Sequence, residues 1–78
     1  MAEVLFNYEG KEIIVECNIN DKMKDIIDKY IVESRNNNIN LNFVYNDNII
    51  NKELKFKEQA NEIDIKNKKM KILAFPNS

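Results

Sequence analysis

The sequence of 78 residues has no histidine, no tryptophan and no threonine, and it has one glycine, one proline and one cysteine. The lack of histidine removes the commonest general base and metal ligand. One glycine cannot make a glycine-rich phosphate loop, and one cysteine can form neither a disulfide framework nor a cysteine-based zinc site. We therefore expect no enzyme, no catalytic residue, no cofactor and no metal site.

The chain also lacks a strong net charge and a long apolar run. Its 12 basic and 13 acidic residues nearly cancel, so we expect neither nucleic acid nor a membrane as a partner. No apolar stretch approaches the ~18 residues of a membrane-spanning helix, and no signal peptide is visible. We expect a single domain over residues 1–78, with a folded part of about 3–75, and an intracellular location, cytoplasmic or nuclear.

Alternating apolar residues predict two strands joined by a tight turn. Val4–Tyr8 and Ile13–Cys17 have the two-residue period of strands with one buried face, and Gly10 supplies the positive φ that the turn needs. Cys17 falls on the buried face, where no electropositive neighbour would lower its pKa. We interpret it as a core residue and not as a catalytic thiol. The predicted inward residues are Val4, Phe6, Ile13, Val15 and Cys17.

A helical period follows this hairpin. Its apolar stripe has the spacing of one helix face, and the stripe consists of Met23, Ile26, Ile27, Tyr30 and Ser34. We expect Asn20 or Asp21 to cap the N-terminus of the helix by accepting hydrogen bonds from its first amides. We expect the Asn36–Asn38 run to end it, because asparagine tolerates the left-handed conformation of a helix exit.

The rest of the chain predicts three more strands and an irregular connection. The strands are Leu41–Tyr45, a short Ile49–Ile50 and Met70–Phe75. This order indicates an α+β fold, a mixed sheet of four to five strands packed on one α-helix. The expected core consists of Phe6, Ile13, Val15, Met23, Ile27, Phe43, Ile50, Leu54, Phe56, Met70 and Ile72.

Three segments resemble ubiquitin-like domains. Gly10–Cys17 is similar to the family's Gly-Lys-x-Ile-x-Leu/Val-x-Val strand, and Phe43–Ile50 resembles its Leu-Ile-Phe-Ala-Gly-Lys-x-Leu segment. Met70–Leu73 matches the closing Leu-x-Leu-Val strand. The resemblance covers about Val4–Phe75 and implies the ubiquitin-like β-grasp fold.

The sequence departs from the family pattern in three places. Asn46 and Asp47 replace the family's small-Gly turn, and the loop before the last strand is longer than usual. The family's C-terminal Gly-Gly is absent, since the sequence reads Phe75-Pro76-Asn77-Ser78 there. We therefore expect a domain that cannot be conjugated.

The resemblance also implies a protein-binding surface. In the family, an apolar patch is formed by the first hairpin, the third strand and the last strand. Carried over by position, it would consist of Tyr8, Val44 and Leu73, with Lys71 beside them. The strand period independently predicts that Val44 and Leu73 point outward, where scattered apolar residues are also common without any function. Three more residues are predicted outward and could form a different face, namely Leu5, Ile14 and Ile49.

A cluster of lysines before and in the last strand allows another interpretation. The cluster consists of Lys66, Lys68, Lys69 and Lys71. It could contact RNA or an acidic partner. No aromatic residue interleaves it to stack on bases, and we favour a solvated loop.

Three classes of function remain. We favour a ubiquitin-like interaction domain that binds ubiquitin-receptor or proteasome-type proteins non-covalently. The alternative is a small structural or adaptor subunit within a larger assembly. A covalent modifier or sulfur carrier comes third, because such proteins need a flexible Gly-Gly terminus.

Overall fold

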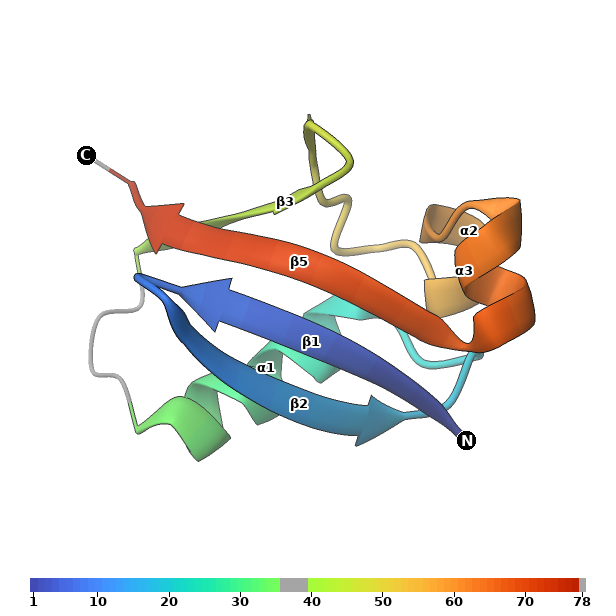
Figure 1. The fold of residues 1–78 in the computed structure, drawn as a ribbon, viewed down its shortest axis with the longest axis horizontal. Coiled ribbons are helices and arrows are strands. Elements are labelled where there is room, and N and C mark those ends of the chain that lie inside the picture. Colours follow the sequence, from blue (N-terminus) through green and yellow to red (C-terminus); the bar gives the residue numbers. More distant parts are fainter. Residues whose placement is uncertain (36–39, 78) are drawn as a thin grey trace.

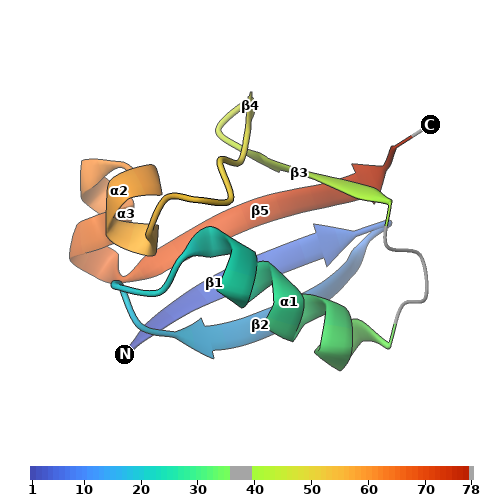
Figure 2. The ribbon, with the colours of Figure 1, turned by 180° about the vertical axis from the view of Figure 1, so that it is seen from behind.

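The chain folds into a five-stranded mixed sheet with a helix across one face (Figures 1 and 2). The structure is a computed structural model, and it describes residues 1–35 and 40–77. The helix is α1 (Met23–Ser34), and the sheet has the order β2-β1-β5-β3-β4. β1 and β5 run parallel, and all other pairs are antiparallel. The strands are β1 (Ala2–Tyr8), β2 (Lys11–Cys17), β3 (Leu41–Tyr45), β4 (Asn48–Ile49) and β5 (Lys69–Pro76). The predicted α+β architecture is confirmed.

Two tight turns set the register of the two hairpins. Glu9 and Gly10 both have positive φ, 52° and 82°, and join β1 to β2. Asn46 and Asp47 have φ values of 48° and 67° and join β3 to β4. Two consecutive left-handed residues make the turn that matches the twist of a hairpin. Asn46 and Asp47 thus replace a glycine-containing turn at low cost, because Asn and Asp tolerate this conformation better than other side chains.

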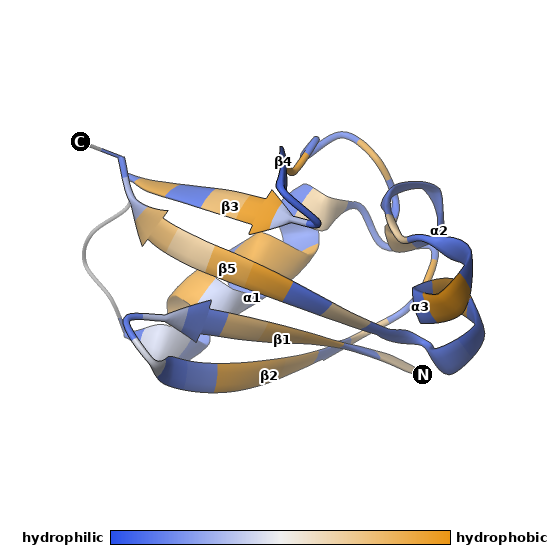
Figure 3. Ribbon diagram, turned by 45° about the horizontal axis from the view of Figure 1, so that its top comes forward, coloured by the Kyte–Doolittle hydropathy of each residue, from blue (hydrophilic) through white to orange (hydrophobic). Residues whose placement is uncertain are grey.

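The core lies between α1 and the inner face of the sheet, and Figure 3 shows hydrophobic residues on α1 and on all four long strands. At its centre Phe6 stacks on Tyr30 with ring centroids 4.4 Å apart. Phe43 meets both rings edge-on, at 5.9 and 6.0 Å. Such aromatic pairs add about 0.5–1.5 kcal/mol beyond their buried area. No buried polar side-chain atom of the described residues lacks a hydrogen-bond partner.

The predicted core is confirmed except at Ile13 and Leu54, which are only half-buried. Ile13 lies near the tip of the first hairpin, beside a hollow where the end of α1 covers β2 incompletely. The Leu54 carbonyl accepts a hydrogen bond from the Met23 amide at 2.8 Å, which joins this loop to the start of α1.

The N-cap of α1 differs from the prediction. The N-cap residue is Lys22 and no side chain caps it. Its first amides instead donate to carbonyls of a distant loop, Met23 to Leu54 and Lys24 to Lys52. The carboxylate of Asp21 is used elsewhere, because it accepts from the Asn18 amide at 2.9 Å. At the other end Arg35 is left-handed, and the Asn36–Asn38 run lies outside the described residues.

The connection predicted as irregular contains two short helices, α2 (Phe56–Gln59) and α3 (Glu62–Asn67). Segments of four and six residues are too short to show a helical repeat. Asn61 caps α3 by accepting from the Asp64 amide at 2.8 Å. The buried Tyr45 of β3 holds α3 in place, since its hydroxyl donates to the Asp64 carboxylate and accepts from the Asn61 amide.

Phe43 offers a direct test of the core. Replacing it with alanine (Phe43→Ala) should lower the free energy of unfolding by about 3–5 kcal/mol, because both aromatic contacts and the filled volume disappear. A domain of this size has only a few kcal/mol to lose, so we expect a largely unfolded protein by circular dichroism at 25 °C. The control is Val32→Ala on α1, where the side chain is 76% exposed. A Phe43→Ala melting curve matching that of the control would contradict the core assignment.

Cys17 should be unreactive while the protein is folded. The thiol is buried, and burial, with the charge of Asp21 second, raises its pKa to about 11. At pH 8 its thiolate fraction should be on the order of a hundredfold below that of an ordinary cysteine. We expect iodoacetamide to label native protein far more slowly than protein in guanidinium chloride, read by mass spectrometry. Equal labelling rates in the two states would show that the thiol is accessible.

Candidate protein-binding surface

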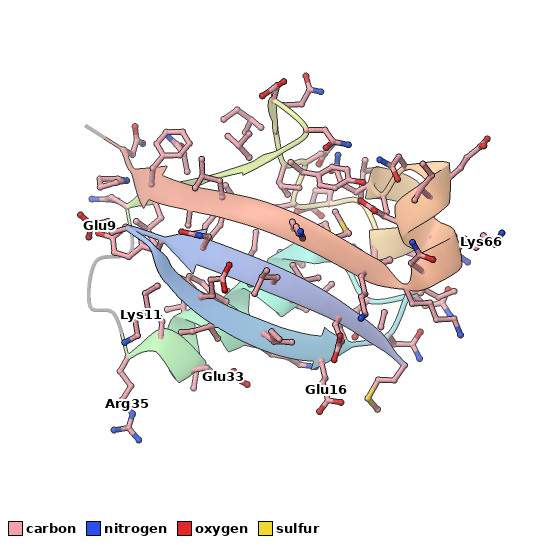
Figure 4. All side chains as sticks on the ribbon, viewed as in Figure 1. Glu9, Lys11, Glu16, Glu33, Arg35 and Lys66 are labelled. Atoms are coloured by element: carbon pink, nitrogen blue, oxygen red, sulfur yellow. The ribbon has the colours of Figure 1, made fainter. Side chains whose placement is uncertain are left out.

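The face of the sheet opposite α1 is not covered by any described segment (Figures 1 and 2). Side chains at alternate positions of each strand point to this open face. Figure 4 shows charged side chains spread around the rim of the domain, among them Glu9 and Glu16 at the first hairpin and Lys66 at α3. The interior of the open face differs from this rim, because several of its side chains are apolar.

Three apolar residues lie side by side across the last three strands. Val44 pairs with Leu73 of β5 on one side and with Ile49 of β4 on the other. Residues paired directly across strands have Cβ atoms about 5 Å apart on the same face. Leu73 is 51% exposed and Ile49 is 63% exposed, while Val44 between them is half-buried. We call Leu73, Val44 and Ile49 the Val44 cluster.

A second apolar group occupies the other half of the open face. Leu5 of β1 pairs with Ile14 of β2, and Ile14 is 55% exposed. We call these two residues the Leu5 cluster. They border a shallow hollow of about 220 Å³. The residues that line it are Glu3, Leu5, Ile14, Lys69, Met70 and Lys71.

Lys71 lies between the two clusters. It pairs with Leu5 across the parallel strands and is two positions before Leu73 on β5. The one ion pair within residues 1–35 and 40–77 joins Lys22 to Glu53 at 3.7 Å. The charges of Lys69 and Lys71 are therefore available to a partner. The predicted lysine cluster is divided, since Lys69 and Lys71 face the open side while Lys68 forms the C-cap of α3.

The structure separates Tyr8 from the other predicted patch residues. Tyr8 follows Val4 and Phe6 at two-residue intervals, so its side chain points to the α1 face. It packs against the core and lines a hollow with Tyr30. The structure thus brings Val44 and Leu73 together, places Lys71 beside them and puts Tyr8 on the opposite side of the sheet.

Ile49, Leu5 and Ile14 were not in the predicted patch, although the strand period had placed all three outward. Their grouping could not be read from the period alone, because it depends on which strands are neighbours. The parallel pairing of β1 with β5 brings Leu5 next to Lys71, and the β3–β4 turn brings Ile49 next to Val44.

A larger hollow of about 650 Å³ lies beside the open face, between α3 and the ends of β3 and β5. Tyr45 and Asp64, joined by their hydrogen bond, form part of its wall. Burial is the main cause that raises the pKa of Tyr45, which keeps its hydroxyl protonated as a donor. Asparagine amides and two lysines supply the other polar groups, from Asn46, Asn61, Asn67, Lys69 and Lys71.

Two features are absent from the described part of the chain. No group of three or more His, Cys, Asp or Glu side chains there could hold a metal ion. No helix there is long and apolar enough to cross a membrane.

Comparison with solved structures identifies the fold of the chain. No protein-family model matches the sequence, and no curated protein sequence matches it. Among solved structures, the chain is similar to the ubiquitin of Caldiarchaeum subterraneum, with a TM-score of 0.77 and 8% identity over 99% of this chain and 94% of that one. It is also similar to ATBAG1, solved in complex with HSP70, with a TM-score of 0.74 and 10% identity. That match covers 99% of this chain and 41% of ATBAG1. At such identities the likeness concerns the fold alone, and the chain has the ubiquitin-like β-grasp fold.

Proposed function

We propose that this domain binds other proteins non-covalently through its open sheet face, with the Val44 cluster at the centre of the site. The observation that carries the proposal is the line of Leu73, Val44 and Ile49 across three neighbouring strands. Single exposed apolar residues are common on protein surfaces. A contiguous group on a flat, uncovered face is typical of an interaction site.

The chemistry of the face supports binding more than catalysis. Apolar anchors that a partner desolvates commonly contribute over 1 kcal/mol each, and Lys71 beside them can select a partner by charge. The most nucleophilic side chain, Cys17, is buried with its pKa raised to about 11, the reverse of what a catalytic thiol needs. We therefore propose a binding role without enzymatic activity. The unpaired thiol of Cys17 also suits a reducing, intracellular environment.

We propose protein partners of the ubiquitin-receptor or proteasome type. The support is the ubiquitin-like fold together with an apolar sheet face, and one structural neighbour, ATBAG1, was solved with a protein bound. The alternative is a structural or adaptor subunit of a larger assembly. In that case the lysines around α3 would carry the contact, because an adaptor without an apolar site depends on charge.

The non-covalent binding that we propose is supported by the end of β5, which is held to the domain. Pro76 still pairs with Leu41, and the Asn77 amide donates to the Asn40 carbonyl at 2.9 Å. This end of β5 also contains no glycine, since the single glycine of residues 1–78 is Gly10 in the first hairpin.

Conjugation can be tested directly. We expect no thioester adduct when the chain is incubated with ubiquitin-like activating enzymes and ATP, as seen on a non-reducing gel. Ubiquitin serves as the positive control in the same reaction. A reducible adduct of the right mass would replace the binding proposal with that of a covalent modifier.

The Val44→Asp substitution tests the proposed site. A charge at the centre of the Val44 cluster should weaken capture of partners from a lysate of the source cell at least fivefold, since one lost anchor is worth over about 1 kcal/mol. The fold should survive, because Val44 is outside the core and cross-strand surface pairs contribute about 0.2–1 kcal/mol.

Two control variants accompany this test. Val32→Asp introduces the same charge at an exposed position of α1 and should leave capture unchanged. Lys68→Glu changes the α3 end, and loss of capture with this variant alone would favour the adaptor alternative. Normal capture by Val44→Asp, with a melting curve near that of wild type, would contradict the proposed site.

A further inference from the structure

The open face carries two apolar clusters and not one, and their placement limits what can bind both. We propose that the partner presents a single amphipathic α-helix, which lies diagonally across β1 and β5. Apolar residues at helix positions i and i+7 would contact the Leu5 cluster and the Val44 cluster, with an acidic residue between them near Lys71. This inference rests on the proposed function and adds the kind of element that the site takes.

The register of the sheet gives the separation of the Leu5 cluster from Leu73 and Val44, the two residues of the Val44 cluster that lie nearer to it. The midpoint of Leu5 and Ile14 lies two strands from the midpoint of Leu73 and Val44, and two residues along the strands. With strands about 4.8 Å apart and a rise of about 3.3 Å per residue, the separation is about 12 Å along a diagonal. Residues i and i+7 of an α-helix lie on one face and about 10.5 Å apart, which fits this span.

A helix suits this face better than an extended segment does. The face presents side chains, while the backbone groups of its three inner strands are already paired in the sheet. An extended peptide lying on it would lose water from its own amides and carbonyls without gaining partners for them. A helix satisfies these groups internally. The face is about 19 Å wide over four strand spacings, enough for one helix of about 10–12 Å diameter.

Charge complementarity indicates which charged residues the bound helix should carry. Lys71 and Lys69 lie on one side of the diagonal, and neither forms an ion pair with a described residue. Glu3 and Glu12 flank the Leu5 end of the diagonal on opposite sides, since Glu3 pairs with Lys69 and Glu12 pairs with Asn7 in the row of Leu73. An acidic side chain at position i+3 or i+4 of the helix would reach Lys71. The direction in which the helix runs decides which of these two positions faces Lys71. Basic or neutral residues would suit the end of the helix that lies over the Leu5 cluster, where Glu3 and Glu12 are.

The test uses designed helical peptides of about 20 residues, rich in alanine and labelled with a fluorophore. Two peptides carry Leu at i and i+7, with Glu at i+3 in one and at i+4 in the other. The control peptide has the same composition but carries Leu at i and i+5, which puts the two leucines on different helix faces. We expect at least one i/i+7 peptide to bind with at least fivefold lower Kd than the control, measured by fluorescence anisotropy.

Variants of the domain then locate the peptide. Ile14→Asp in the Leu5 cluster and Val44→Asp in the Val44 cluster should each raise the Kd of the peptide at least fivefold. Val32→Asp should leave this Kd unchanged. Lys71→Glu should also raise the Kd of the peptide. A second peptide, with Lys in place of Glu, should bind the Lys71→Glu variant with the Kd restored. Recovery requires direct pairing, because a general loss of fold would not be repaired by a change in the peptide.

The outcomes distinguish this inference from the proposed function. If Val44→Asp abolishes capture of the cellular partner while Ile14→Asp has no effect on it, the partner uses the Val44 cluster alone and the helix across both clusters is wrong. Absence of binding by both i/i+7 peptides at millimolar concentration, or equal binding of the i/i+5 control, would also overturn the inference. Normal cellular capture by Val44→Asp would instead overturn the proposed function itself.

Discussion

The main constraint on this domain is that one helix covers one face of a five-stranded sheet. Of the described helices only α1, with 12 residues, is long enough to bury a sheet face, while α2 and α3 have four and six residues and lie at one end. The inner face therefore has the aromatic cluster and the buried aliphatic residues, and the outer face remains in contact with solvent. The apolar residues on that outer face contribute little to the core, which is why we assign them to binding.

The same alternation of side chains produces both faces. Met70 and Ile72 are buried while Lys71 and Leu73 are exposed on the same strand. Phe43 is part of the aromatic cluster and its neighbour Val44 is the centre of the proposed site. A one-residue shift in β3 or β5 would exchange the core and the binding surface. The tight turn at Asn46 and Asp47 fixes the β3–β4 register. The same turn therefore keeps Val44 and Ile49 paired on the open face.

Local patterns predicted most of the fold, because strand alternation and helical spacing are properties of neighbouring residues. They placed Val44 and Leu73 outward and α1 against the sheet. The predicted N-cap of α1 was wrong for the opposite reason, since the amides of Met23 and Lys24 are satisfied by carbonyls far along the chain. Tyr8 shows a different limit. Tyr8 follows Val4 and Phe6 at two-residue intervals and so faces α1 with them, whereas the family resemblance, carried over by position, assigned it to the patch.

The parallel pairing of β1 with β5 has a consequence for how the chain acquires its structure. These strands are neighbours at the middle of the sheet, yet they are the first and the last elements along the chain. On the ribosome, β1 can pair with β2 as soon as both emerge, but its other edge must wait until residues 69–76 have been released. Until then Val4 and Phe6 lack the strand that pairs beside them. Such long-range closure slows folding and leaves the nascent chain with an exposed strand edge. Cotranslational protection of that edge would matter more for this domain than for one whose central strands are adjacent in the chain.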